Sequence, residues 1–113
     1  MKIQTQQNGN SITITLTGRF DASVAQKFKN TINELIDQNN SLFVIDLAEV
    51  DYMDSGGLGS LVASLRRVRE KEGEIKLCSP NSKVRKVFEL TRTHRIFDIY
   101  DNSLVAAQSF QTA

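Results

Sequence analysis

The run Leu42-Phe43-Val44-Ile45 places the strongest constraint on the fold of this chain. All four residues are apolar, whereas a strand with one face in water alternates apolar and polar residues. A short continuous apolar run therefore indicates a central strand that is covered on both faces. Helical spacing of apolar residues over 22–38 and 56–71 supplies a helix on each side of it in sequence. Strands that alternate with helices favour parallel pairing through right-handed crossovers.

The residues before the first predicted helix form a hairpin. Residues 12–17 alternate strictly between aliphatic residues and threonines, which predicts a half-buried strand. A weaker alternation covers residues 2–6. Asn8-Gly9 lies between the two runs and is a hairpin signal, because both residues tolerate positive φ. An antiparallel pair is therefore expected at the N-terminus, and Asp21 or Ser23 is expected to cap the helix that follows.

The second half of the chain continues the alternation of strands and helices. After the helix over 56–71, we expect a strand at 75–78, a helix after Pro80, a short strand at 96–99 and a helix over 102–111. Leu104 and Phe110 are the expected apolar anchors of the last helix. The predicted order is β-β-α-β-α-β-α-β-α. The predicted fold class is α/β, with a mixed, mostly parallel sheet, an N-terminal antiparallel hairpin and about four helices, in a single domain over residues 1–113.

Composition narrows the class of protein. The chain has 113 residues, of which 40% are apolar and 24% charged, as in an ordinary soluble domain with one core. No apolar run approaches the roughly 18 residues of a membrane span, and no signal peptide is visible. The lone cysteine, Cys78, excludes an internal disulfide and fits a cytoplasmic setting. In the second half of the chain, basic residues outnumber acidic ones. Acidic residues interrupt the basic ones, and the interleaved aromatic residues of a stacking platform are missing, which favours a solvated face over nucleic-acid binding.

Ser55 is the candidate functional residue. It stands within Asp51-Tyr52-Met53-Asp54-Ser55-Gly56-Gly57-Leu58-Gly59, at the predicted junction between the central strand and the next helix. A serine at a helix start is usually a cap worth about 1 kcal/mol. Asp54, however, could cap the helix itself. Gly56 and Gly57 would each cost up to about 1 kcal/mol relative to alanine in a helix, so we interpret them as leaving the Ser55 hydroxyl open to another molecule.

A phosphate on Ser55 would affect binding more than folding. At a helix N-terminus an anion is favoured by about 0.3–1 kcal/mol. Pressed against a partner built for a neutral hydroxyl, beside Asp51 and Asp54, the same dianion could cost several kcal/mol through repulsion and desolvation. The pattern predicts a site that switches binding without unfolding the domain.

These motifs resemble those of the STAS family, the sulfate-transporter and anti-sigma-factor-antagonist domain. The resemblance rests on Asp46-Leu47, Val50 and Met53-Asp54-Ser55-Gly56-Gly57-Leu58-Gly59, on Gly18-Arg19-Phe20-Asp21, and on Cys78-Ser79-Pro80 through Val84, Phe88 and Leu90. It covers almost the whole chain and is greatest to the small, free-standing bacterial antagonists.

The resemblance implies partner switching without enzymatic activity, cofactor or metal. In this family the unphosphorylated antagonist binds an anti-sigma factor that is also a serine kinase of GHKL type, and the sigma factor is released. Phosphorylation dissociates the complex, and a PP2C-type phosphatase resets it. The acceptor serine falls on Ser55, while Gly56 stands where many members carry a second serine or threonine. The protein is expected to be a monomer when free. The predicted partner-binding residues are Asp21, Ser23, Met53, Asp54, Ser55, Gly56, Gly57 and Leu58.

Other functions fit the residues less well. Asp46 resembles a receiver phosphoacceptor, but no acidic residue precedes Asp21 to hold the magnesium such sites need. No phosphate-binding loop ending in Lys-Ser or Lys-Thr is present, and His94 has no placed partner. Asp21, Asp51 and Asp54 are better explained as turn residues than as cation ligands.

Two questions stay open from the sequence. Met53 and Leu58 could belong to the core or to a docking patch. The chain could also be an accessory STAS subunit of a lipid-transport complex, or a partner-switching regulator with a target other than a sigma factor.

Overall fold

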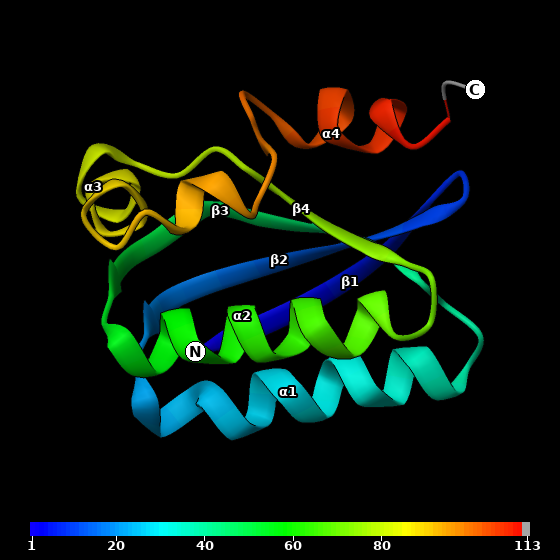
Figure 1. Ribbon diagram of the computed structural model, residues 1–113, viewed down its shortest axis with the longest axis horizontal. Coiled ribbons are helices and arrows are strands. Elements are labelled where there is room, and N and C mark those ends of the chain that lie inside the picture. The colour runs from blue at the N-terminus through cyan, green and yellow to red at the C-terminus, as the bar shows by residue number, and fades with distance from the viewer. Residues whose placement is uncertain (112–113) are drawn as a thin grey trace.

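One five-stranded sheet with four helices forms the fold, seen in a computed structural model that describes residues 1–111 (Figure 1). The elements are β1 (Lys2–Asn8), β2 (Ser11–Phe20), α1 (Ala22–Asp37), β3 (Leu42–Met53), α2 (Ser55–Arg69), β4 (Glu74–Cys78), α3 (Ser82–Leu90), a 3₁₀ turn (Thr93–Arg95), β5 (Ile99–Tyr100) and α4 (Ser103–Ser109). The strands lie in sequence order. β1 and β2 are antiparallel and the other pairs are parallel, which confirms the predicted fold class.

The helices cover the sheet unequally. α1 and α2 lie side by side on one face, α4 lies on the other face, and α3 lies at one end (Figure 1). The large core lies between the sheet and α1, α2 and α3, and its helical members include Phe28, Ile32, Leu61, Leu65 and Phe88. A small second cluster under α4 contains Val44, Cys78, Ala106 and Ala107. Phe43 and Ile45 belong to the large core and Val44 to the small one, so β3 is buried on both faces, as its apolar run predicted.

β3 is longer than the sequence suggested. The stretch from Asp51 was expected to be a connection, but β3 continues to Met53 and pairs with the end of β2 through Arg19–Tyr52 and Phe20–Met53. Two register shifts in this ladder allow the pairing to continue. Such irregularities break the simple alternation of apolar and polar residues, which is why the pattern did not reveal them. Asp54 alone then separates β3 from α2.

The N-terminal hairpin differs from expectation in two details. Asn8 is still paired with Ser11, so the turn is Gly9-Asn10, and Gly9 adopts φ +61°. The threonine face of β2 is not fully solvated either. Thr13 is only 5% exposed, because α4 packs over that part of the sheet, and the Asn8 side-chain amide donates a 2.7 Å hydrogen bond to Thr13 Oγ1. The prediction of a half-buried strand is therefore wrong at Thr13.

The C-terminal region also departs from the sequence pattern. The strand expected at 96–99 is shorter and begins later, at Ile99–Tyr100, because residues 96–98 continue the turn that follows the 3₁₀ turn at Thr93–Arg95. Leu104 is 66% exposed and is not an anchor of α4. Phe110 does pack against the small core, and Lys76 Nζ lies 4.3 Å from its ring centroid. No helix within residues 1–111 combines the length and apolarity needed to cross a membrane.

Candidate functional site at the start of helix α2

Ser55 is the first residue of α2, and its side chain is exposed at the carboxyl end of the central strand. Asp54 is the N-cap. Its Oδ1 accepts hydrogen bonds from the backbone N–H of Gly56 at 2.8 Å and of Gly57 at 3.0 Å. Within residues 1–111, no hydrogen bond involves the Ser55 hydroxyl. The capping role therefore belongs to Asp54, and the Ser55 hydroxyl is left available for chemistry or binding.

The two glycines after Ser55 allow close packing inside the molecule. A Cβ on Gly57 would lie 2.0 Å from the carbonyl oxygen of Phe20, and a Cβ on Gly56 would lie 2.6 Å from Ala22 Cα. The first turn of α2 thus presses against the junction between β2 and α1. This corrects the interpretation that the glycines are there to leave the serine open. It also explains Gly56, because a hydroxyl-bearing side chain at that position would collide with Ala22.

The β2–α1 junction contributes the second half of the site. Asp21 caps α1, and its Oδ1 accepts from the Ser23 backbone N–H at 3.0 Å and from the Ser23 hydroxyl at 2.5 Å. The bond from the Ser23 hydroxyl is the main cause that lowers the pKa of Asp21 below its usual value. The backbone N–H of Asp54 donates to Phe20 O at 3.4 Å, so the two junctions adjoin.

The predicted partner-binding residues divide into an accessible group and a buried group. Met53 and Leu58 are 5% and 7% exposed and belong to the large core, so the core interpretation holds for both. Gly57 is buried as well. The accessible members are Asp21, Ser23, Asp54, Ser55 and Gly56.

Arg19 and Tyr52 extend the accessible surface and were missed from the sequence. Their side chains stack across β2 and β3, with the Arg19 guanidinium 4.0 Å from the Tyr52 ring centroid. Arg19 Nε also lies 3.6 Å from Asp21 Oδ2. The signal that could have found the pair is the position of Tyr52 beside Met53, since neighbouring strand residues point to opposite faces.

The charge around Ser55 is mainly acidic. Asp51 is exposed, while Asp54 and Asp21 are partly exposed. Among residues 1–111 no three acidic, histidine or cysteine side chains form a group that could hold a metal ion. The Gly56 and Gly57 N–H groups are already bonded to Asp54. A phosphate on Ser55 would therefore be favoured by the helix dipole alone, and opposed by the neighbouring carboxylate.

Other reactive residues have structural surroundings. Cys78 is fully buried, and burial together with the nearby charge of Asp46 raises the pKa of its thiol to about 12. Asp46 Oδ1 accepts a hydrogen bond from the Ala48 N–H at 3.0 Å. His94 Nδ1 lies 3.3 Å from the carbonyl oxygen of Phe88. Cys78 is thus a packed core residue, and Asp46 and His94 make local contacts with the backbone.

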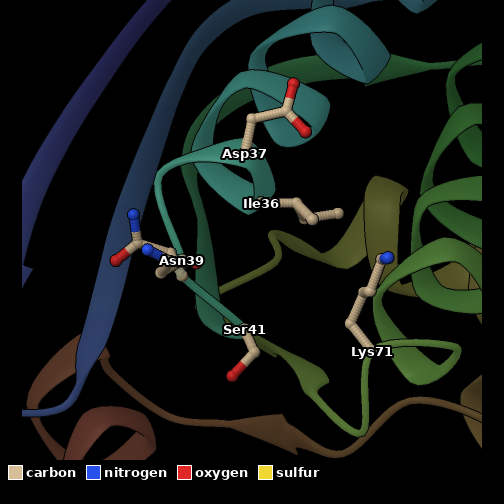
Figure 2. A pocket seen from close by; sticks show the side chains of 6 residues that line it. Ile36, Asp37, Asn39, Ser41 and Lys71 are labelled. Carbon is tan, nitrogen blue, oxygen red and sulfur yellow. The ribbon is translucent and has the colours of Figure 1, made fainter.

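A cavity of about 400 Å³ lies at the other end of β3 and α2 from Ser55, lined by Ile36, Asp37, Asn39, Asn40, Ser41 and Lys71 (Figure 2). The polar groups of Asn39 and Ser41 point away from the Lys71 amine (Figure 2). The Asn40 amide donates to the carbonyl of Leu35 at 3.1 Å. Because its polar groups do not converge, this cavity does not indicate a ligand site.

Comparison with known proteins gives the family. The model of the STAS domain matches residues 2–106. The anti-sigma-B factor antagonist of Listeria monocytogenes is 31% identical over 94 residues, covering 83% of this chain and 82% of that protein. The crystal structure of the Thermotoga maritima protein TM1081 superimposes with a TM-score of 0.91 at 25% identity, over 97% of this chain and 95% of that one.

The fold is shared with a protein known in a modified state. The Bacillus cell fate determinant SpoIIAA in its phosphorylated form superimposes with a TM-score of 0.75 at 20% identity, over 98% of this chain and 100% of that one. The family match, the sequence relative and the shared fold lead to one conclusion: this chain belongs to the STAS domain family.

Proposed function

We propose that this protein is an anti-sigma factor antagonist that acts by partner switching, with Ser55 as the phosphorylated residue. The observation that carries the proposal is the exposed, unbonded hydroxyl of Ser55 at a helix start that Asp54 already caps and that packs against the β2–α1 junction. Support comes from the sequence relative named an anti-sigma-B factor antagonist. SpoIIAA, which shares the fold, has been solved in a phosphorylated form, so this fold can carry a phosphate.

The chain contains its own comparison for Ser55. Two other helices begin with a serine that follows an asparagine N-cap. These are Asn81-Ser82 at α3 and Asn102-Ser103 at α4. A serine that follows the N-cap of a helix is therefore not in itself a marker of function in this protein. The start of α2 differs because it adjoins the β2–α1 junction and is surrounded by carboxylates. Ser82, which is exposed and follows the cap Asn81, is a matched control for Ser55.

The energetics favour a switch that acts on the partner. In the free protein, the helix dipole stabilises a phosphate by about 0.3–1 kcal/mol, and repulsion from Asp54 offsets part of this. At an interface, a dianion facing a surface built for a neutral hydroxyl can cost several kcal/mol, and each 1.4 kcal/mol is about tenfold in affinity. The interface effect is the larger one, so phosphorylation releases the partner while the domain stays folded.

The partners in this scheme are proteins. The unphosphorylated form binds an anti-sigma factor that is a GHKL-type serine kinase, through a surface that contains Ser55, Asp21, Ser23, Arg19 and Tyr52. A PP2C-type phosphatase restores the unphosphorylated form. The protein itself performs no catalysis in this cycle, because the kinase and the phosphatase carry out both covalent steps.

The direct test is phosphorylation of the purified protein by its cognate kinase and ATP, followed by peptide mapping. We expect phosphate on Ser55 in the wild-type protein and in Ser82→Ala, and none in Ser55→Ala. Label that persists in Ser55→Ala would show that another residue is the acceptor.

A charge substitution tests the switch itself. Ser55→Asp should weaken binding to the anti-sigma factor by about tenfold or more, while its melting temperature stays within about 3 °C of wild type. Ser82→Asp should leave the affinity unchanged. Equal weakening by both substitutions, or unfolding of Ser55→Asp, would contradict the proposed role of Ser55.

A further inference from the structure

The groove between α1 and α2 contains a second set of polar side chains, well separated from Ser55. A cavity of about 130 Å³ is lined by Lys29, Asn33, Ala63, Ser64 and Arg67. Four of these five residues are polar, two of them are cations, and none is acidic. Ser64 follows Ser55 by nine residues, which is roughly 13 Å along the axis of α2, so the two sites are distinct.

Ser64 is the least expected residue in this groove. Gly56, Ser60 and Ser64 recur at four-residue spacing and lie on one side of α2, and their small size allows α1 to pack closely. The Ser60 hydroxyl donates to Gly57 O at 2.7 Å. Ser64 is 3% exposed, yet its hydroxyl has no hydrogen-bond partner within residues 1–111. A buried hydroxyl without a partner is unfavourable, so Ser64 leaves the wall of this groove with a polar group that the described residues do not satisfy.

The other polar side chains of the groove are also unpaired. Within residues 1–111, Lys29, Asn33 and Arg67 make no side-chain hydrogen bond or ion pair. Arg69 on the same helix, in contrast, bonds to Glu74 at 3.2 Å. Lysine and arginine can only donate hydrogen bonds, and serine and asparagine can also donate. The set therefore suits a ligand that carries negative charge and several acceptor oxygens.

We propose that the α1–α2 groove binds a small oxyanion of the phosphate class. Tetrahedral oxyanions match these donors, because charge-assisted hydrogen bonds are the strong ones. A cavity needs roughly 10–15 Å³ to hold one water. The volume of about 130 Å³ therefore accommodates an inorganic phosphate with a few waters, and it is too small to enclose the base and sugar of a nucleotide as well. This assignment does not depend on the proposed role of Ser55.

The test is titration of the isotope-labelled protein with inorganic phosphate, followed by amide chemical shifts, against sodium chloride at equal ionic strength. Saturable shifts are expected around residues 29, 33 and 63–67. Arg67→Gln should weaken binding by about tenfold, whereas Arg66→Gln, a neighbouring exposed residue outside the groove, should change it less than about twofold.

Two further measurements separate a built site from general charge attraction. Ser64→Ala should remain folded and bind phosphate several-fold more weakly. Adenosine monophosphate should bind no more tightly than phosphate. Shifts that do not saturate, equal weakening by Arg66→Gln and Arg67→Gln, unchanged affinity in Ser64→Ala, or tighter binding of the nucleotide would each overturn the proposal.

Discussion

Two adjacent residues have different roles at the start of α2. Asp54 satisfies the N–H groups of Gly56 and Gly57, and its carboxylate also lies at the positive end of the helix dipole. Ser55 follows with an exposed hydroxyl that the fold does not use. The structure thus separates the residue that stabilises the helix from the residue that we propose is modified.

Asp54→Ala is expected to lower the free energy of unfolding by about 1 kcal/mol, because both N–H groups lose their acceptor. The corresponding fall in melting temperature is roughly 4–8 °C for a domain of this size. Asp51→Ala is the control. Asp51 is exposed and makes no side-chain hydrogen bond in the described part of the chain, so its removal should change stability by less than about 0.5 kcal/mol. If Ser55→Ala caused the larger loss instead, Ser55 would be the cap.

The contact between helix α2 and the β2–α1 junction depends on how closely the backbones of the two segments can approach each other. Gly57 permits the first turn of α2 to lie against the Phe20 carbonyl. Gly59, two residues later, faces open space. Both residues lie in the same helix, so alanine substitutions at the two positions distinguish the effect of helix propensity from the effect of packing.

Gly57→Ala should be destabilising by about 1–3 kcal/mol. The gain in helix propensity is about 1 kcal/mol, but a Cβ placed 2.0 Å from Phe20 O forces the helix away from the junction. Gly59→Ala has the same gain without the collision and should stabilise the protein by about 0.4–1 kcal/mol. Urea unfolding of the two variants measures both effects. A stabilised Gly57→Ala would show that the close approach is not required.

Across the whole molecule, the sheet separates two unequal cores. The large core is closed by α1, α2 and α3, and the small one by α4 alone. Cys78 lies in the small core, where the charged form of its thiol is disfavoured, first by burial and second by the charge of Asp46. Its ionisation is therefore coupled to opening of this side of the fold.

Cys78 predicts a loss of stability at alkaline pH. Its pKa rises from 9.0 to about 12 in the folded state, so the folded protein holds this proton more tightly than the unfolded chain. The stability that this protonated thiol contributes is complete below pH 9 and is lost as the pH rises from 9 toward 12. Denaturant midpoints between pH 8 and 11, compared with those of Cys78→Ala, measure it, and the variant should show the shallower decline. A thiol reagent should react with the native protein only as fast as it opens. Rapid labelling of the folded protein would contradict the burial of Cys78.

The candidate site was predictable where its signals are local. The position of Ser55, the cap at Asp54 and the cap at Asp21 can all be read from neighbours in sequence, because capping joins groups two or three residues apart. The fate of Met53 and Leu58 was not predictable. An apolar residue beside a functional serine can face either solvent or core, and only the packing of α2 on the sheet places both in the core.

The amino-acid sequence by itself determined the order of the elements, the parallel centre of the sheet and the junction that carries Ser55. These follow from periodicity and turn chemistry, which act over a few residues. The tertiary structure alone decided why Gly56 and Gly57 are glycines, how far β3 extends, that Arg19 stacks on Tyr52, and that Ser64 is buried without a partner. Each of these depends on distances between segments remote in sequence, and such distances are set by how whole elements pack together.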